Sequence, residues 1–157
     1  MEDKISKLIN EYKLYYCVEC GKCVAGCPMN VIYDDFSYSF CSRGIIRKAM
    51  LEQDVVDGGD IWRCLNCNLC ADVCPAGVSY AQFIADARNM AMAEGHTENA
   101  AYCECCGKYY LPMPTVDAYN HILDKNNRPD GYTKLCPSCK LASCAENMKL
   151  DVFRIGK

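Results

Sequence analysis

The sequence predicts a mainly α-helical protein in two parts, and two observations lead to this. Within residues 1–95, apolar residues recur at helical spacing on either side of two cysteine-rich blocks. From residue 102 to 157 that periodicity is lost, and tyrosines, prolines and turn-forming residues surround a further set of cysteines. We therefore expect a helical domain over 1–95, a linker over 96–101, and a small metal-binding module over 102–157.

Three helices are expected in the first part: at residues 3–13, at 42–53, and from Ser79 to about Gly95. Ser79 and Gln82 have the spacing of a capping box, and Gly95 suits the end of a helix. Residues 57–60 (Asp-Gly-Gly-Asp) predict a turn. The apolar faces of the helices would be formed by Ile5, Leu8, Ile9 and Tyr12, by Ile45, Ile46, Ala49 and Met50, and by Phe83, Ile84, Ala87 and Ala91.

The two cysteine blocks share the pattern C-x2-C-x2-C-x3-C-P, which is typical of proteins with two [4Fe–4S] clusters. In this pattern three cysteines bind one cluster and the fourth reaches across to the other. One cluster would take Cys17, Cys20, Cys23 and Cys74, and the other Cys64, Cys67, Cys70 and Cys27. Because every ligand is a thiolate, no iron is left open for a substrate, which favours electron transfer over catalysis.

A second kind of metal site is expected in the C-terminal module. Two C-x-x-C knuckles, separated by 29 residues, offer Cys103, Cys106, Cys136 and Cys139 as ligands. The knuckles resemble those of rubredoxin and zinc ribbons, and four thiolates suit a tetrahedral Zn or Fe ion. We expect one Zn²⁺ that organises a module poor in apolar residues. Rubredoxin-type iron and a third Fe–S cluster are the alternatives, the latter because Cys105 and Cys144 supply extra thiols.

Composition restricts the class of protein. Fifteen cysteines, an odd number, stand in a chain without a recognisable signal peptide, which favours metal ligation over disulfides. There are 17 basic and 20 acidic residues with no basic stripe, which argues against a nucleic-acid partner. No apolar run approaches the roughly 18 residues of a membrane-spanning helix. A cytoplasmic protein without a membrane partner is expected.

With these motifs in place, residues 12–95 resemble the C-type iron–sulfur subunit of heterodisulfide reductase. The stretches that carry the resemblance are Cys17–Met29, Ser42–Leu51 and Ile61–Ala91, with a 36-residue gap between Cys27 and Cys64 that holds a helix. Related cysteine blocks occur in iron–sulfur subunits of succinate dehydrogenase-like and glycolate oxidase-like enzymes. The resemblance implies an α-helical ferredoxin fold.

The resemblance also implies a role. The chain would relay electrons from a flavin- and cluster-bearing partner to a catalytic partner that cleaves a disulfide such as CoM-S-S-CoB, in anaerobic methanogenesis. The chain alone would then not be an enzyme. The alternatives are an iron–sulfur subunit of another dehydrogenase or reductase, or an Fe–S redox sensor whose zinc ribbon binds a protein or nucleic acid.

Several single residues have expected places. Cys41 lies outside both blocks and is expected to be a buried structural thiol. Trp62 is expected to pack over a cluster and exclude water. The basic residues Arg43, Arg47 and Lys48 would form a solvated helix face or dock an acidic partner, and both histidines would be surface or linker residues. An interface with other proteins is expected at the apolar residues that flank the first block, namely Leu14, Tyr15, Tyr16, Val31, Ile32 and Tyr33.

Overall fold

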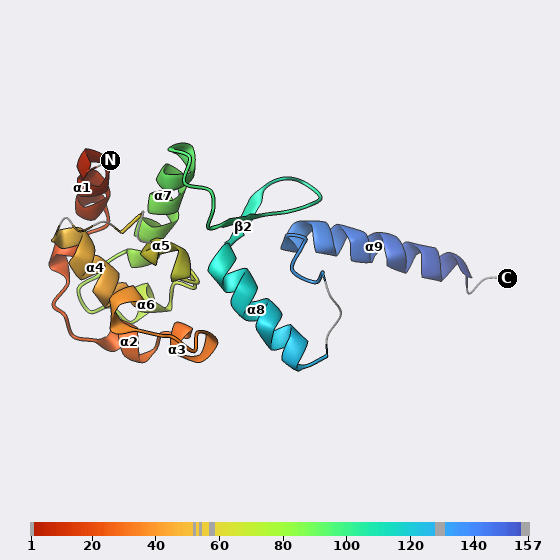
Figure 1. Cartoon of the computed structure of the whole chain (residues 1–157), viewed down its shortest axis with the longest axis horizontal. Helices are drawn as coiled ribbons and strands as arrows, with labels where there is room; N and C mark the ends of the chain where they lie inside the picture. Colours follow the sequence, from red (N-terminus) through yellow and green to blue (C-terminus); the bar gives the residue numbers. More distant parts are fainter. Residues whose placement is uncertain (1, 52, 54, 57–58, 128–130, 155–157) are drawn as a thin grey trace.

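The computed structural model describes the backbone of residues 2–51, 53, 55–56, 59–127 and 131–154, and the side chains of those that fall within 4–145. Helices dominate, and the strands that are present form one two-stranded sheet (Figure 1). In chain order the elements are α1 (Glu2–Glu11), η1 (Leu14–Tyr16), α2 (Lys22–Ala25), α3 (Met29–Ile32), η2 (Tyr38–Phe40), α4 (Ser42–Met50), α5 (Asp60–Arg63), α6 (Leu69–Asp72), α7 (Tyr80–Ala93), β1 (Ala100–Tyr102), β2 (Tyr109–Pro112), α8 (Met113–Lys125) and α9 (Pro137–Arg154).

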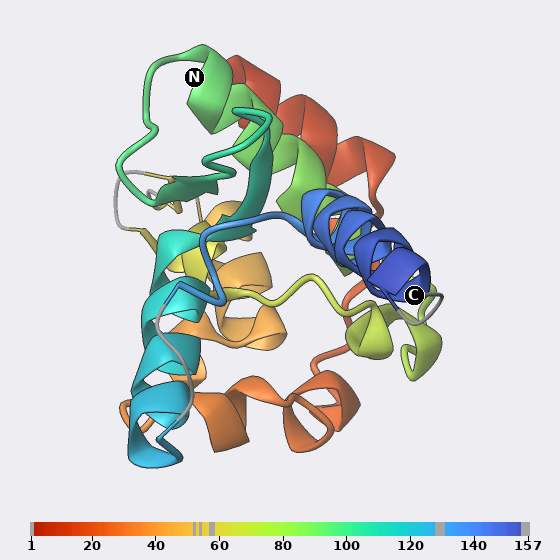
Figure 2. The ribbon, with the colours of Figure 1, turned by 90° about the vertical axis from the view of Figure 1, so that its right-hand side faces the viewer.

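The three helices expected in the first part are confirmed as α1, α4 and α7, and they build the core of a helical body. Helix α1 contacts α7 and α4, and the two views of the ribbon show α1 and α7 side by side (Figures 1 and 2). The side chains with no exposed surface include Leu14, Ile45, Ile61, Trp62, Phe83 and Ile84. The short helices α2 and α6, each of which contains the third cysteine of its block, lie on the same body and contact each other.

Helix α7 ends as the sequence indicates but begins differently. Gly95 adopts φ 99°, and the N–H of His96 donates to the carbonyl of Ala91 at 3.0 Å, which closes the helix with a Schellman motif. At the other end Ser79 is the N-cap residue, but its side chain accepts no capping hydrogen bond. The expected capping box is therefore absent. The expected turn at 57–60 lies partly outside the described residues.

The expected linker is shorter than predicted, because its last two residues belong to strand β1. Ala100 and Ala101 are 5% and 4% exposed, and β1 pairs antiparallel with β2, with a bulge between Ala101 and Tyr102. Helix α8, which the sequence analysis missed, follows β2 directly and contacts α5 of the helical body. The hairpin and α8 thus pack against the first part of the chain.

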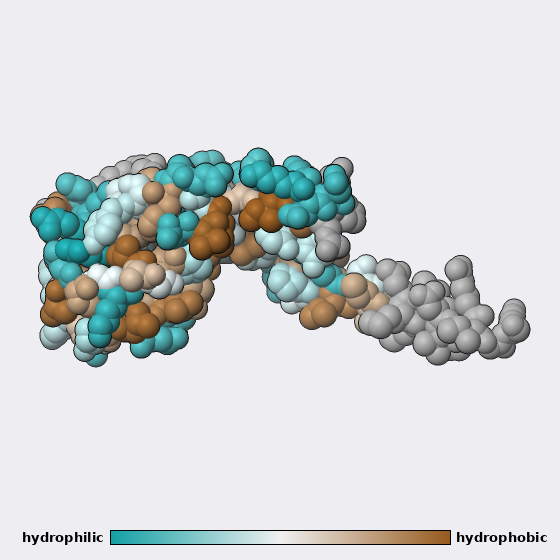
Figure 3. All heavy atoms as spheres, turned by 90° about the horizontal axis from the view of Figure 1, so that it is seen from below, coloured by the Kyte–Doolittle hydropathy of each residue, from teal (hydrophilic) through white to brown (hydrophobic). Residues whose placement is uncertain are grey.

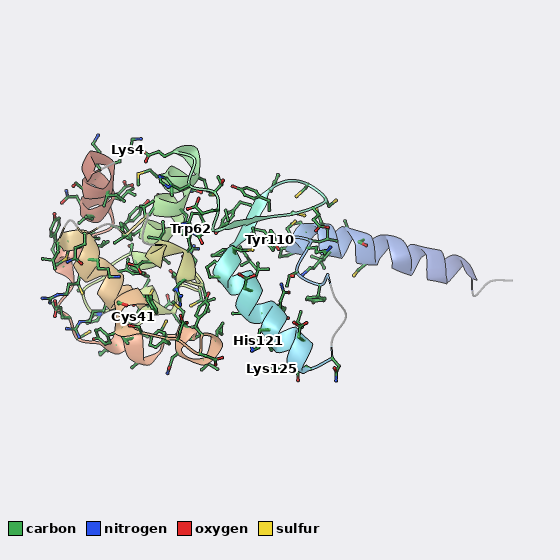
Figure 4. All side chains as sticks on the ribbon, viewed as in Figure 1. Lys4, Cys41, Trp62, Tyr110, His121 and Lys125 are labelled. Atoms are coloured by element: carbon green, nitrogen blue, oxygen red, sulfur yellow. The ribbon has the colours of Figure 1, made fainter. Side chains whose placement is uncertain are left out.

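The junction between the two parts is aromatic. Trp62 on α5 is fully buried, and its ring meets the ring of Tyr109 edge-on, with centroids 6.2 Å apart. The hydroxyl groups of Tyr33 and Thr115 lie 3.0 Å apart across the same junction. Figure 4 shows Trp62 between the helical body and α8. Beyond this junction α9, also missed, extends away from the helical body (Figures 1 and 2).

Candidate metal centres

The two cysteine blocks fold as copies of one backbone motif. Each cysteine of the second block follows its counterpart by 47 residues. Glu19 and Asn66 both adopt φ 53°, and Gly21 and Asn68 adopt φ 77° and 67°. Two left-handed residues at the same positions turn the chain on either side of the second cysteine, and a short helix that contains the third cysteine follows in both copies, α2 and α6. Asparagine can take the place of glycine here because it tolerates the left-handed conformation better than most residues.

Ion pairs connect the first block to helix α4. Glu19 accepts hydrogen bonds from Arg43 at 2.5 Å and from Arg47 at 3.1 Å, which ties the cysteine loop to α4. Its hydrogen bond with Arg43 is the main reason that the pKa of Glu19 is lowered. The basic residues of α4 therefore pair with acids of the chain, and Lys48 likewise pairs with Asp60 of α5. The sequence left open a solvated face or a dock for an acidic partner; Arg47 is exposed to solvent, and all three basic residues pair with acids of this chain.

A first cavity gathers three cysteines of the first block and the last cysteine of the second. Cys17, Cys20, Cys23 and Cys74 line it together with Cys70. Cys27 does not border it. The remaining walls are largely apolar and come from the first block, from α4 and from the segment after Cys74, including Val18, Ile46, Ala76, Val78 and Tyr80.

A second cavity gathers the complementary set. Cys27, Cys64, Cys67 and Cys70 line it together with Cys23, and Cys17 does not border it. Cys23 and Cys70, the third cysteine of each block, therefore lie between the two cavities. All eight cysteines singled out in the two blocks border one or both of these hollows, and no described cysteine forms a disulfide.

Three thiols of the second cavity, those of Cys27, Cys64 and Cys70, have raised pKa values and are hard to ionise without a cation. Burial is the main reason that the pKa of Cys70 is raised to about 12, and charge on Cys64 adds to it. Burial also raises the pKa of Cys27 and of Cys64. Metal ligation needs thiolates, so the positive charge of iron would have to offset this desolvation. Backbone N–H groups contribute as well: that of Asn66 donates to Sγ of Cys64 at 3.3 Å, and that of Val78 to Sγ of Cys74 at 3.4 Å.

The four cysteines expected to bind metal in the C-terminal module converge on one point. The Sγ atoms of Cys103, Cys106, Cys136 and Cys139 all lie within 4.8 Å of one another, and those of Cys106 and Cys136 are 3.9 Å apart. Four sulfurs at about 2.3 Å from a tetrahedral zinc ion would be about 3.8 Å apart. The spacing of the thiols therefore fits a single tetrahedral ion.

Local structure explains the convergence. Cys103 directly follows β1, and the chain then turns at Gly107, whose φ is 67° and whose N–H donates to the carbonyl of Cys103 at 2.9 Å. Cys136 precedes α9, and Cys139 lies in the first turn of that helix. The first knuckle is thus part of a β-hairpin, as in a ribbon. The second begins a helix, which differs from the ribbon expected from the sequence.

The two buried cysteines of this group of four are linked by a hydrogen bond. The N–H of Cys136 donates to Sγ of Cys103 at 3.2 Å. This bond is the main reason that the pKa of Cys103 is lowered to about 6, and the N–H groups of Cys106 and Cys105 add to it. Hydrogen bonding to the surrounding sulfurs, that of Cys136 above all, raises the pKa of Cys139. Cys103 is therefore ready to ligate near neutral pH, and the last thiol needs the metal to lose its proton.

The remaining cysteines and the tryptophan fall outside these centres. Cys105 and Cys144 are exposed, and neither belongs to the four converging thiols. Cys41 is fully buried, as predicted, and its sulfur accepts from the N–H of Gly44 at the start of α4 (Figure 4). Trp62 borders neither cavity. The expectation that it covers a cluster is wrong, because its ring packs against Tyr109 at the junction with the hairpin.

Sequence reasoning missed two residues that border both cavities, Ser42 and Tyr80. Each is the first residue of a helix, α4 and α7, and only the packing of those helices brings it to the cysteines. Burial is the main reason that the pKa of Tyr80 is raised well above its usual value, so its hydroxyl keeps its proton. No sequence signal distinguishes either residue from an ordinary serine or tyrosine.

A comparison with known families agrees with this geometry. Residues 13–78, which contain both cysteine blocks, match the family described as 4Fe-4S dicluster domain. No curated protein matches the sequence. None of the helices in the described part of the chain is long and apolar enough to cross a membrane. The family match supports an iron–sulfur, ferredoxin-like character for residues 13–78.

Proposed function

We propose that this chain carries two [4Fe–4S] clusters with crossed ligands and passes electrons between partner proteins. The observation that carries the proposal is that each of the two cavities collects three cysteines of one block and the last cysteine of the other. One cluster is held by Cys17, Cys20, Cys23 and Cys74, and the other by Cys64, Cys67, Cys70 and Cys27. Crossed ligation requires this arrangement.

Electron transfer follows from the ligand sets. The clusters supply one-electron redox chemistry when bound, and four thiolates per cluster leave no iron site for a substrate. The protein's part is to hold the two clusters next to each other and to keep water away with apolar walls. Because Cys23 and Cys70 lie between the two cavities, a short path joins the centres.

The partners that we propose are the flavin- and cluster-bearing protein and the disulfide-reducing protein of a heterodisulfide-reductase-like complex. The resemblance of residues 12–95 suggests them, and exposed apolar side chains that flank the first cysteine block in the sequence support docking there. Tyr15, Tyr16 and Val18 are 59%, 66% and 67% exposed around Cys17, and Val31 is 86% exposed. Apolar residues are spread over the underside of the helical body in Figure 3. Leu14 and Tyr33, also expected at this interface, are instead buried in the core.

The C-terminal thiols hold one Zn²⁺ in this proposal, and the ion fixes α9 to the hairpin. The fit of the sulfur spacing to a single tetrahedral ion supports it. Because two ligands come from the hairpin and two from the start of α9, the ion would hold these two segments together. Its role is structural.

Metal and sulfide analysis of anaerobically purified protein, with EPR of the reduced form, tests the composition. About eight iron, about eight acid-labile sulfide and about one zinc per chain are expected. An extra iron in place of zinc, with a high-spin ferric signal, would make the C-terminal site rubredoxin-like. About four iron or fewer would contradict the two-cluster proposal.

Serine variants test the crossed ligands. Cys74→Ser and Cys17→Ser should perturb the EPR signal of the same cluster, and Cys27→Ser and Cys64→Ser that of the other. Cys144→Ser, which changes an exposed thiol outside all three centres, is the control and should change neither signal. If Cys74→Ser instead perturbs the same cluster as Cys64→Ser, the ligands are not crossed. The partners are tested by whether the intact protein, purified from its source under anaerobic conditions, carries a flavoprotein with it.

A further inference from the structure

Two hydroxyl groups are buried where the two cysteine cavities meet. Ser42 is 5% exposed and Tyr80 is 2% exposed, and both line the first cavity as well as the second. Ser42 begins α4 and Tyr80 begins α7, so they approach from different helices. A residue that borders both cavities lies near both groups of four cysteines.

Neither hydroxyl has a hydrogen-bond partner within the described part of the chain. Leaving a buried polar group unpaired is costly, and native proteins rarely do so. Two other buried side-chain atoms without a partner do not fit a donor beside the cysteines. Nε1 of Trp62 borders neither cavity, and Oδ1 of Asn68 can only accept a hydrogen bond. Ser42 and Tyr80 are thus the unpaired donors that face the cysteines.

The surroundings favour sulfur as the acceptor. The cavity walls next to these hydroxyls are largely apolar and contain cysteine sulfurs, and cluster sulfides and thiolates are the acceptors that would fill the space when the clusters are bound. Both residues also open helices of 9 and 14 residues, whose N-terminal ends carry positive partial charge. The hydroxyls and the helix ends therefore both favour negative charge at the same place.

We propose that the hydroxyls of Ser42 and Tyr80 donate hydrogen bonds to sulfur atoms of the two clusters and stabilise their reduced forms. The inference rests on the proposed two-cluster function and adds the residues that tune it. Reduction adds negative charge to a cluster, so a hydrogen bond to its sulfur strengthens on reduction and raises the reduction potential. Because the two residues lie between the cavities, they would act where the electron passes from one cluster to the other.

The test is a redox titration of the full-length, anaerobically purified protein, followed by EPR, with Tyr80→Phe and Ser42→Ala. Each variant removes one hydroxyl and keeps the size of the side chain nearly unchanged. The midpoint potential of at least one cluster is expected to shift to more negative values in each variant, with iron and sulfide content unchanged. Ser42→Thr, which keeps a hydroxyl, should restore the wild-type potential.

Tyr33→Phe is the matched control. Tyr33 is also a buried tyrosine, but its hydroxyl is paired with Thr115 and it borders neither cavity, so its removal should leave both potentials unchanged. Pulsed EPR of the reduced wild type should show exchangeable protons coupled to a cluster, and this proton coupling should weaken in the variants. If Tyr80→Phe assembles poorly, the coupling measured in Ser42→Ala alone still reports the contact. Unchanged potentials and proton couplings in loaded variants would overturn the inference. A wild type without two clusters would overturn the proposed function instead.

Discussion

Arg88 is expected to be the buried polar residue on which the stability of the helical body depends most. Its side chain is 4% exposed at the centre of α7. Nε and Nη2 both donate to the carbonyl of Ile61, at 2.9 and 2.6 Å, and Nη2 also donates to the carbonyl of Cys64. The guanidinium group lies over the ring of Trp62, 5.8 Å from its centroid. One side chain thus fixes the segment that leads into the second cysteine block.

Arg88→Met keeps an unbranched side chain and removes every one of these hydrogen bonds. Two buried carbonyl groups would lose their hydrogen-bond partner, which costs about 1–3 kcal/mol of stability for each group. The variant no longer buries a charged side chain, and this offsets part of that cost. We expect a net destabilisation of about 3 kcal/mol, equivalent to a fall of roughly 10 °C in the apparent unfolding temperature of a chain of this size. Arg88→Lys, which can reach one carbonyl, should lose about half as much.

The measurement is thermal unfolding followed by circular dichroism under anaerobic conditions, at one scan rate and at matched iron content. Arg47→Met is the control, because the side chain of Arg47 is 63% exposed and its ion pair with Glu19 is a surface pair worth less than about 1 kcal/mol. The reasoning is refuted if Arg88→Met unfolds within about 2 °C of the wild type, or no lower than Arg47→Met.

Three further predictions concern other parts of the chain. An alanine at Gly44 would place its Cβ 2.1 Å from the carbonyl oxygen of Tyr38, so Gly44→Ala should destabilise the protein by about 3 kcal/mol in the same thermal assay. Gly26→Ala is the control: the atom nearest to its Cβ would be 3.8 Å away, and its stability should differ from the wild type by no more than about 0.5 kcal/mol. Elemental analysis of Cys103→Ser should show loss of the C-terminal metal, and hydrogen exchange should show weaker protection of the hairpin amides. If Cys103→Ser retains as much metal as Cys144→Ser, the four-thiol site is contradicted. The hydrogen bond from the Tyr12 hydroxyl to Asp86 raises the pKa of Tyr12 to about 12 from 10.0, so the stability it adds is complete below pH 10 and is lost as the pH rises through 12. Unfolding measured between these pH values should therefore depend less on pH in Tyr12→Phe, and equal slopes would show that this pair contributes nothing.

Some features of the molecule could be predicted because they depend on neighbours in the sequence. The helices α1, α4 and α7 follow from apolar residues at helical spacing, which the structure buries on one face. The eight cysteines of the blocks were singled out by their spacing alone, since two-residue gaps let successive thiols bind different irons of one cluster. The four thiols of the C-terminal site were found in the same way, and the structure brings them together.

Other features were not predicted. Helix α8 has apolar residues at helical spacing, Val116, Tyr119 and Leu123, but they lie among the turn-forming residues of 102–157 and only Val116 is buried. The described side chains of α9 are mostly exposed, so its helix has little apolar face to reveal it. The expected place of Trp62 beside a cluster was wrong because its position depends on Tyr109, which lies far along the chain. Proximity in sequence to Cys64 did not imply contact with the site.

The sequence by itself determined which cysteines are candidates for binding metal and predicts that the two similar blocks cooperate, because ligand chemistry depends on residue type and short spacing. Tertiary structure alone decided which hydroxyls face the cysteines, which arginines pair with Glu19, and how the hairpin and α8 pack on the helical body. The physical reason is that burial and hydrogen-bond partnership belong to the packed chain. Ser42 and Tyr80 acquire a candidate role only where α4 and α7 bring both cavities together.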